Sequence, residues 1–482
     1  MRARIQGKNM SDLSYASAVE LGKLIKEKAV SPVEVVRATL ERAERLQPSL
    51  NCFITLCGDA AMDAAKAAES EIMAGRYRGP LHGIPYAAKD LVDTAGVRTT
   101  YGTLAYKDHV PQRDAVAVAR LKQAGAILFG KTTTPEFGSQ SITRSPLFGD
   151  TRNAWSAEHS SGGSSGGAAV AVATGIGAIG IATDGGGSTR IPASVNGVVG
   201  LKQGLGVIPH SQAQDSYGNQ TYVTPISRTV MDTIVMLEAM AGADGCDPWS
   251  MARGSAAVMD DTTAPTLRGC RIKYCLAPRG KLVEASVEQA FSAALKIMAD
   301  AGAQLQAFDA GEEFDVEPIW RTVNHTVWRS RFGKLVQERP ADFSATFIRQ
   351  IESAQSYTAG DYQEAMFART RLFRHVESLL ADADMLVTPT LLRPALPLRQ
   401  DLFEPFEIAG RRIEGIRSNW FPWTMPFNMT GNPAISLPNG FDPAGLPIGI
   451  QFIGSLGQDG ELLRRALAFE ALTPRHYGRP IA

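Results

Sequence analysis

The first part of the chain carries apolar residues at helical spacing. Residues 31–46 have them every three or four positions, and Ser31, Pro32 and Glu34 supply an N-cap, a favourable first helical position and a capping box. Residues 59–75 are rich in alanine and end at a glycine. The pattern therefore predicts a group of N-terminal helices.

From Leu81 onward, short apolar segments follow the helical ones. Residues 114–125 fit a helix that ends at a glycine, and residues 126–132 fit a short buried strand. Residues 168–182 form the longest uncharged apolar run, which is too short to span a bilayer and is interrupted by glycines. We expect this run to be a buried helix that leads into a buried strand.

The same order of helix and strand returns in the second half of the chain. Residues 286–302 fit a helix capped by Ser286 and Gln289, residues 303–308 fit a strand, and residues 317–382 are mainly helical. Three later segments have the apolar pattern of strands: residues 384–390, 433–438 and 445–454. This alternation predicts an α/β fold in which helices on both faces cover a large mixed β-sheet.

Composition adds limits on function. The 482 residues include 44% hydrophobic and 20% charged residues, and 49 basic residues balance 49 acidic ones. A net charge of zero argues against a general binder of nucleic acid, and no segment fits a membrane span. The first ten residues have no apolar core of a secretory signal, and Met10 is an alternative start.

Cysteine usage points to a reducing environment. The five cysteines are odd in number and lack metal-like spacing with histidine, so we expect free, mostly buried thiols and a cytoplasmic location. The sequence suggests no metal or other cofactor. The oligomeric state stays open, with a homodimer among the alternatives.

Two motifs suggest chemistry that their contexts do not favour. Residues 125–132 match the G-x-x-x-x-G-K-T pattern of a phosphate-binding loop, but their four middle residues are apolar and Pro135 opposes a following helix. We expect a buried strand that ends at Gly130. Residues 163–167 match the G-x-S-x-G nucleophile elbow with Ser165 as nucleophile, but loop-like residues precede them instead of a strand.

A third set of residues fits acyl transfer better. The first Gly/Ser segment (residues 159–172) and the second Gly/Ser segment (residues 183–190) flank an apolar stretch, and Lys89 follows another one. A buried lysine loses its charge and can replace histidine as the base for a serine nucleophile. The successive N–H groups of residues 185–188 can form a nest for an oxyanion.

These residues resemble the amidase signature family of Ser-cisSer-Lys hydrolases. The motifs GIPYAAKD, GGSSGGAAVAV, TDGGGSTRIPAS and GLPIGIQFIG occur in the family's order, and the resemblance covers about residues 15–475. Spacing also agrees, since 75 positions separate Lys89 from Ser164 and 24 separate Ser164 from Ser188. The resemblance implies one amidase domain over residues 1–482.

The resemblance implies a role for each residue of the site. Ser188 is the acyl-forming nucleophile, Ser164 relays its proton and follows a cis peptide bond, and Lys89 is the terminal base. The remaining expected site residues are the oxyanion and substrate-binding glycines Gly185, Gly186, Gly187 and Gly138, and the supporting residues Ser165, Asp184 and Arg190. The aromatic stretch at residues 418–428 fits either core packing or an acyl pocket.

The expected function is hydrolysis of a small or medium acyl amide or anilide, with activity on esters left open. The expected partner is a small-molecule amide, without nucleic acid or membrane. The alternatives are the amidase subunit of an aminoacyl-tRNA amidotransferase, an inactive relative, an esterase that uses Ser165, and a nucleotide-binding protein that uses residues 125–132.

Overall fold

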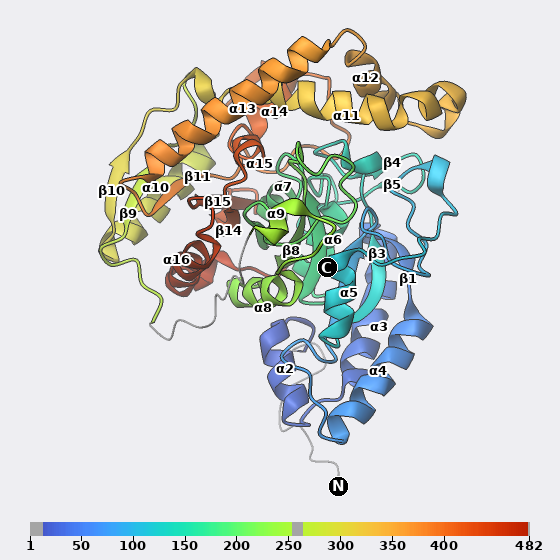
Figure 1. Cartoon of the computed structure of the whole chain (residues 1–482). Helices are drawn as coiled ribbons and strands as arrows, with labels where there is room; N and C mark the ends of the chain where they lie inside the picture. The colour runs from blue at the N-terminus through green and yellow to red at the C-terminus, as the bar shows by residue number, and fades with distance from the viewer. Residues whose placement is uncertain (1–12, 253–263, 481–482) are drawn as a thin grey trace.

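One large mixed sheet organises the molecule (Figure 1). The computed structural model describes residues 13–252 and 264–480, so the alternative start at Met10 lies outside the described residues. In spatial order the strands are β1 (Phe53–Leu56), β3 (Ile127–Thr132), β2 (Pro85–Lys89), β6 (Ile179–Asp184), β8 (Tyr222–Ser227), β7 (Val199–Lys202), β14 (Ala434–Phe441), β15 (Pro447–Ile453), β11 (Met385–Pro389), β9 (Arg271–Tyr274) and β10 (Gln304–Ala307).

The directions of the strands bring the ends of β2 and β6 to the same edge of the sheet. β2 runs parallel to its neighbours β3 and β6, whereas β1 is antiparallel to β3 and β8 is antiparallel to β6. At the far end of the sheet, β9 is parallel to both β10 and β11. Because parallel strands end at the same edge, the last residues of β2 and β6 lie close together.

Helices cover both faces, as the sequence predicts. They are α2 (Ala18–Lys26), α3 (Pro32–Leu50), α4 (Gly58–Met73), α5 (Val116–Gln123), α6 (Gly166–Ala173), α7 (Arg190–Asn196), α8 (Val230–Met240), α9 (Pro248–Met251), α10 (Ala285–Asp300), α11 (Glu317–Glu338), α12 (Ala345–Ser353), α13 (Ala359–Leu380), α14 (Ile416–Trp420), α15 (Met425–Thr430) and α16 (Asp459–Leu472). Short additional elements are the 3-10 helices η1 (Leu104–Tyr106), η2 (Glu136–Gly138), η3 (Glu312–Phe314), η4 (Pro340–Asp342) and η5 (Pro474–His476), and the strand pairs β4 (Arg144–Ser145) with β5 (Gly149–Asp150) and β12 (Phe406–Ile408) with β13 (Arg411–Ile413).

The alternation of side chains along β2 separates two cores. Tyr86 and Ala88 pack in the core that includes residues of α2, α5, α8, α10 and α16, whereas Ala87 packs with residues of α3, α4 and α6 on the other face. A further core contains residues of α7, α11, α13, α14 and α15. The two faces are therefore buried by different sets of helices.

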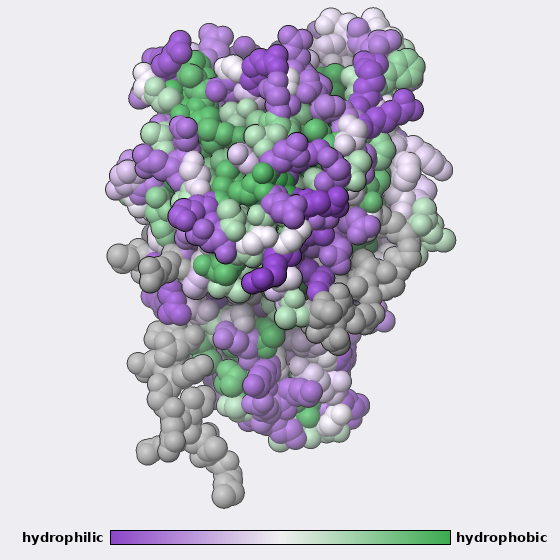
Figure 2. Space-filling view, turned by 90° about the vertical axis from the view of Figure 1, so that its left-hand side faces the viewer, coloured by the Kyte–Doolittle hydropathy of each residue, from purple (hydrophilic) through white to green (hydrophobic). Residues whose placement is uncertain are grey.

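Two groups of three helices lie at opposite ends of the molecule. Figure 1 shows α11, α12 and α13 together at one end and α2, α3 and α4 at the other. The side seen in Figure 2, which is the left side of Figure 1, mixes hydrophobic patches with hydrophilic residues. The edge strand β10 lies on this side, and its Gln304 and Gln306 are exposed. Polar residues on an edge strand limit pairing with other chains.

Most predicted elements are confirmed, including the capping box at Ser31, the helix and strand within residues 168–182, and the late strands. Three details are wrong. A strand, β1, interrupts the N-terminal helices, and β3 continues past Gly130 to Thr132. Helix α10 begins one residue before Ser286, so its N-cap is Glu284 and Ser286 forms no cap.

Candidate active site

Lys89 lies at the end of β2, where three hydroxyl groups surround its amine. The lysine side chain has no exposed surface. Its Nζ lies 2.7 Å from Ser164 Oγ and 2.8 Å from both Ser165 Oγ and Thr183 Oγ1. Thr183 comes from β6, which pairs in parallel with β2. The sheet and the first Gly/Ser segment together bring the expected base to the expected relay serine.

The electrostatic environment of Lys89 disfavours an ammonium ion. Burial lowers the pKa of Lys89 well below its ordinary value, and the Asp184 carboxylate opposes this shift only in part. Asp184 is itself occupied by Arg190, whose Nε lies 3.0 Å from its Oδ2. Burial therefore favours the neutral amine of Lys89 over the ammonium ion.

The first Gly/Ser segment holds Ser164 in a tightly packed turn. The Gly163–Ser164 peptide bond is cis, as predicted. A Cβ atom at Gly163 would lie 2.6 Å from Ile142 N, so no larger residue fits there without a shift of the backbone. Ser164 is only 1% exposed and lies just before α6.

Ser165 links the two Gly/Ser segments. Its backbone N–H donates to Ser188 O at 3.1 Å, and its hydroxyl donates to Thr183 O at the same distance. Ser165 is fully buried and does not line the cavity onto which Ser164 opens. Ser165 therefore contacts Lys89 and both Gly/Ser segments from outside the cavity.

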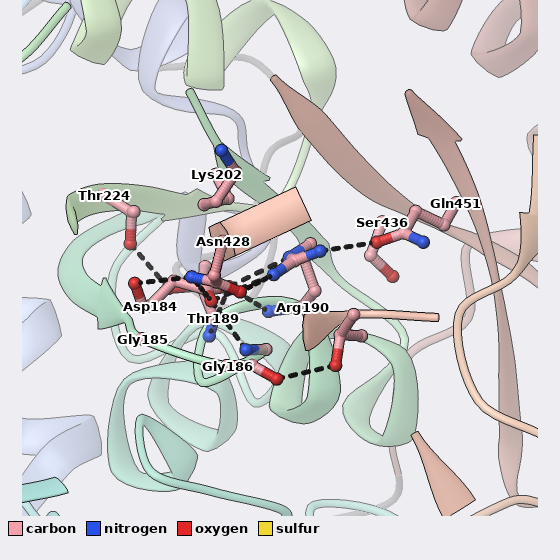
Figure 3. A network of polar contacts seen from close by, with 12 residues as sticks. Asp184, Gly185, Gly186, Thr189, Arg190, Lys202, Thr224, Asn428, Ser436 and Gln451 are labelled. Atoms are coloured by element: carbon pink, nitrogen blue, oxygen red, sulfur yellow. Dashed lines mark hydrogen bonds and ion pairs between the residues drawn. The ribbon is translucent and has the colours of Figure 1, made fainter. Parts of the chain in front are cut away.

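Asp184 anchors the loop that carries Ser188 (Figure 3). Its carboxylate accepts hydrogen bonds from the N–H groups of Gly187 (2.7 Å) and Thr189 (3.2 Å), and it forms a fully buried ion pair with Arg190. Although burial alone would raise the pKa of Asp184, the Arg190 guanidinium and the hydrogen bonds hold it well below its usual range. The loop between β6 and α7 is thus fastened from within, while Ser188 stays partly exposed.

Four side chains from distant segments also hold this loop, and sequence reasoning missed all of them. Trp320 Nε1 donates to Gly185 O (2.7 Å), Thr424 Oγ1 donates to Gly186 O (2.7 Å), Asn428 Nδ2 donates to Asp184 O (3.0 Å), and Gln451 Oε1 accepts from Arg190 Nη1 (2.8 Å). Figure 3 shows Asn428 and Gln451 on either side of Arg190. Only the fold reveals these contacts.

The glycines of this loop do not all play the expected part. Gly187 has φ +123° and a Cβ there would lie 2.3 Å from Thr424 Oγ1, so this position requires glycine. Its N–H, however, donates to Asp184 and is not free for an oxyanion. In the described part of the chain, no acceptor takes the N–H groups of Gly185, Gly186 or Ser188. These three groups are the available donors.

A cavity of about 490 Å³ opens onto the two serines. Ser164, Ser188 and Gly138 line it, and a Cβ at Gly138 would lie 3.1 Å from Ser164 Oγ. Its aromatic and charged walls include Tyr101, Tyr106, Phe137, Trp320, Trp328, Phe332, Phe421, Asp93, Asp215, Arg331 and Arg417.

The aromatic stretch at residues 418–428 contributes both to the core and to the cavity wall. Trp420 and Trp423 have no exposed surface and pack in the core that contains α13 and α15. Phe421 belongs to the same core and also lines the cavity. One short segment therefore supplies core packing and part of the cavity wall.

The competing motifs are not borne out by their surroundings. Lys131 of the phosphate-loop pattern lies in β3 and is fully buried, with its amine on Val92 O and two threonine hydroxyls. Ser165 follows a loop rather than a strand, and Lys89 rather than a histidine contacts its hydroxyl. Neither a phosphate loop nor a nucleophile elbow is formed.

The described residues show no metal-binding group, membrane-spanning helix or disulfide. Among residues 13–252 and 264–480, no group of three or more His, Cys, Asp or Glu side chains is placed to hold a metal ion. Within the same residues, no helix is both long and apolar enough to cross a membrane. All five cysteines are free, although only Cys52 and Cys270 are buried, fewer than expected.

The chain is similar to known amidases over most of its length. The model of the Amidase family matches residues 34–463. An acylamidase of Rhodococcus erythropolis is 33% identical over 96% of both chains, and a glutamyl-tRNA(Gln) amidotransferase subunit of Acidothermus cellulolyticus is 31% identical over 98% of this chain and 97% of its own. The crystal structure of a bacterial aryl acylamidase of the amidase signature family superposes with a TM-score of 0.87, at 27% identity over 97% and 99% of the two chains.

The chain therefore belongs to the amidase signature family. It is a hydrolase that acts on the carbon–nitrogen bond of amides.

Proposed function

We propose that this amidase works through an acyl-enzyme on Ser188, with Ser164 and Lys89 as its proton relay. The observation that carries the proposal is the buried Lys89 amine, 2.7 Å from the Oγ of Ser164, which lines the same cavity as Ser188. A neutral amine is a competent general base, and burial favours the neutral form.

The hydrogen bonds around Lys89 fit a neutral amine. Such an amine has two N–H donors and one lone pair, and it has three hydroxyl neighbours. The Ser165 hydroxyl donates its hydrogen bond to Thr183 O, so towards Lys89 it acts as an acceptor. The lone pair remains for a proton from Ser164 or from the Thr183 hydroxyl. Ser164 and Thr183 both line the cavity, and we assign this proton to Ser164, which lies in the cavity wall beside Gly138.

The reaction then follows from these positions. Lys89 takes the Ser164 proton while Ser164 takes that of Ser188, and the Ser188 oxygen attacks the amide carbonyl. The relay returns a proton to the leaving amine, and water later releases the acid by the same path. The Ser164 and Ser188 hydroxyls are not hydrogen-bonded to each other in this structure, so the step requires a side-chain rotation that closes this gap.

The loop before α7 supplies the oxyanion site. We assign this role to the N–H groups of Gly185, Gly186 and Ser188, with Gly187 as a structural position held by Asp184. Trp320 and Thr424 fix the first two peptide units through their carbonyl oxygens. Preorganised donors of this kind are each worth about a hundredfold or more in turnover.

The substrate proposal is a small or medium acyl amide or anilide. A cavity of about 490 Å³ lies in the range of small-molecule sites, and aromatic side chains such as Trp320, Phe332 and Phe421 suit an aryl or alkyl group. The relative named acylamidase and the structure named aryl acylamidase support this choice. We extend the proposal to one domain over residues 1–482, a cytoplasmic location and a homodimer as the oligomer to test.

A second candidate is the amidase subunit of an aminoacyl-tRNA amidotransferase. It is favoured by the 31% identity to a glutamyl-tRNA(Gln) amidotransferase subunit over 98% of the chain. Purified alone, such a protein should depend on its partners for release of ammonia from glutamine. Hydrolysis of anilides by the isolated chain, without activity on glutamine, would decide for the stand-alone amidase.

Covalent labelling with an uncharged fluorophosphonate tests the proposed nucleophile. Mass spectrometry should find the adduct on Ser188, and Ser188→Ala should abolish it. Ser165→Ala should keep part of the labelling, and Ser139→Ala is a matched control because Ser139 lines the same cavity. An adduct that survives Ser188→Ala but not Ser165→Ala would overturn the assignment.

A further inference from the structure

A buried guanidinium lies in the wall of the catalytic cavity without an acidic partner. Arg417 of α14 is 8% exposed and lines the cavity. Its Nη2 donates to Gln350 Oε1 at 3.0 Å, and its guanidinium carbon lies 5.1 Å from the centre of the Trp320 ring. Within the described part of the chain, Arg417 takes part in no ion pair.

The charges around Arg417 do not neutralise it. Glu317 attracts the guanidinium, but it already forms an ion pair with Arg321 at 3.3 Å. Burial lowers the pKa of Arg417 to about 10, with Glu317 opposing and Arg321 adding to the shift. Arg417 therefore stays cationic at neutral pH. A buried cation without a counter-ion is costly, and a guanidinium presents a planar fork of N–H donors that matches a carboxylate.

Trp320 contacts both Arg417 and the loop between β6 and α7 that carries Ser188, called the nucleophile loop below. The same indole that contacts Arg417 donates its N–H to Gly185 O, and a Cβ at Gly186 would lie 2.9 Å from its Nε1. Arg417 and the residues that precede Ser188 thus contact one aromatic ring. A ligand bound at Ser188 within this cavity lies within reach of the guanidinium.

A second side chain of the cavity is also left without a partner. Gln220 is 3% exposed and lines the cavity, and neither atom of its side-chain amide has a hydrogen-bond partner in the described part of the chain. Its neighbour Thr221 lies beside Gly185, since a Cβ at that glycine would be 3.0 Å from Thr221 Cγ2. Unpaired buried polar groups of this kind indicate that the cavity is built for a polar ligand.

We propose that Arg417 is a specificity-determining residue that selects amide substrates bearing a carboxylate, in either the acyl or the amine part. This inference rests on the proposed acyl transfer at Ser188. The carboxylate would take N–H donors of Arg417 that Gln350 does not use, while the reacting amide lies at Ser188. Gln350 positions the guanidinium, and Trp320 keeps it at the cavity wall.

Matched pairs of substrates test the proposal. For the acyl part, the 4-nitroanilide of glutaric acid is compared with that of pentanoic acid; for the amine part, 4-acetamidobenzoate is compared with 4-methylacetanilide. The wild-type protein should favour the carboxylate member of at least one pair by about 10–100-fold in kcat/KM, as expected for a charge-assisted pair. Arg417→Gln should reduce that preference to about threefold or less.

Two further variants make the test specific. Arg329→Gln removes a positive charge of α11 that does not line the cavity and leaves the Arg321–Glu317 pair intact, so it should keep the preference. Arg417→Lys keeps the charge but loses the planar fork, so an intermediate preference is expected. A wild-type protein that hydrolyses both members of each pair equally well would overturn the proposal, as would an unchanged preference in Arg417→Gln.

Labelling separates this inference from the proposed function. Fluorophosphonate should label Ser188 in the wild type and in Arg417→Gln, and glutaramate should protect Ser188 in the wild type about tenfold better than pentanamide. Absence of any Ser188 adduct contradicts the proposed function. Labelling that both amides slow equally contradicts only the role of Arg417.

Discussion

Two buried lysines on neighbouring strands have different hydrogen-bonding surroundings. Lys89 ends β2 and Lys131 lies in β3, and neither side chain has exposed surface. Lys131 donates to Val92 O and to the hydroxyls of Thr94 and Thr99. Those two hydroxyls donate their own protons to backbone carbonyl groups. All three partners of Lys131 are therefore acceptors, and they demand three N–H donors.

The three partners of Lys89 do not all have to accept hydrogen bonds from its amine. Ser165 must accept from the amine, but Ser164 and Thr183 have no other hydrogen-bond partner for their hydroxyl groups within the described residues and can donate. Burial lowers the pKa of Lys131 only to about 8, since Asp90 opposes the shift, whereas that of Lys89 falls well below its ordinary value. The two lysines are therefore buried alike, and they differ in whether neighbouring hydroxyl groups are free to donate to the amine, as the proposed role of Lys89 requires.

The largest expected effect comes from removing the Lys89 amine. Lys89→Met should slow acylation of Ser188 by about a thousandfold or more, because general-base assistance is lost. The variant should unfold at a temperature close to that of the wild type, since it replaces a desolvated amine with an apolar group. Stopped-flow labelling and thermal unfolding measure the two quantities. A fully active Lys89→Met would contradict the relay.

The next largest effect is expected from breaking the buried ion pair between Arg190 and Asp184. Asp184→Asn leaves Arg190 buried without its carboxylate, and we expect a loss of about 3–5 kcal/mol in the free energy of unfolding. The pKa of Asp184 is lowered in the folded state, so its contribution is complete above the unfolded value of about 3.9 and declines as the pH falls below it. Urea unfolding at pH 7 and pH 3 should therefore show a smaller pH dependence in the variant; an equal dependence would argue against this.

The matched variant at the second lysine should affect stability instead of activity. Lys131→Met removes the donor to Val92 O and leaves Asp90 without its nearby cation, so a loss of about 2–3 kcal/mol in the free energy of unfolding is expected. Acylation of Ser188 should fall less than tenfold where the variant is folded. A thousandfold loss of acylation in a folded Lys131→Met would erase the distinction between the lysines.

The smallest effect is expected at Thr183. Thr183→Val removes one of the two hydroxyls able to donate to Lys89 but keeps Ser164, so acylation should fall by about threefold to tenfold. Ser164→Ala should cost far more, because it interrupts the relay. Rates measured side by side on the two variants identify the donor. Equal losses would show that Thr183 shares the role assigned to Ser164.

The sequence could predict the parts of the site that lie in local motifs. Lys89 follows an apolar strand, and the two Gly/Ser segments contain Ser164 and Ser188, so motif order and spacing are sufficient to select them. The structure brings Lys89 and Ser164 into contact and places Ser188 in the same cavity. Thr183 begins the second Gly/Ser segment, and its role could have been found from the parallel ends of two buried strands.

The supporting side chains could not be predicted in this way. Trp320 and Asn428 reach the nucleophile loop from segments 135 and 244 positions away from their partners, and only tertiary packing selects them. The sequence also does not show that the Gly187 N–H donates to the Asp184 carboxylate, because this depends on the orientation of that side chain. Local errors have a similar cause, because β1 forms only by pairing with β3, and its isolated pattern does not indicate a strand.

The pH dependence of Ser188 acylation tests the central claim most directly. With an uncharged fluorophosphonate, the neutral form of Lys89 is the active one in the proposed mechanism. Its lowered pKa means that the rate should level off well below the pH at which an ordinary lysine titrates, and should fall as acid protonates the amine. The slow residual rate of Lys89→Met should lack this titration. A wild-type rate that keeps rising towards about pH 10.4, the value of an ordinary lysine, would contradict the account.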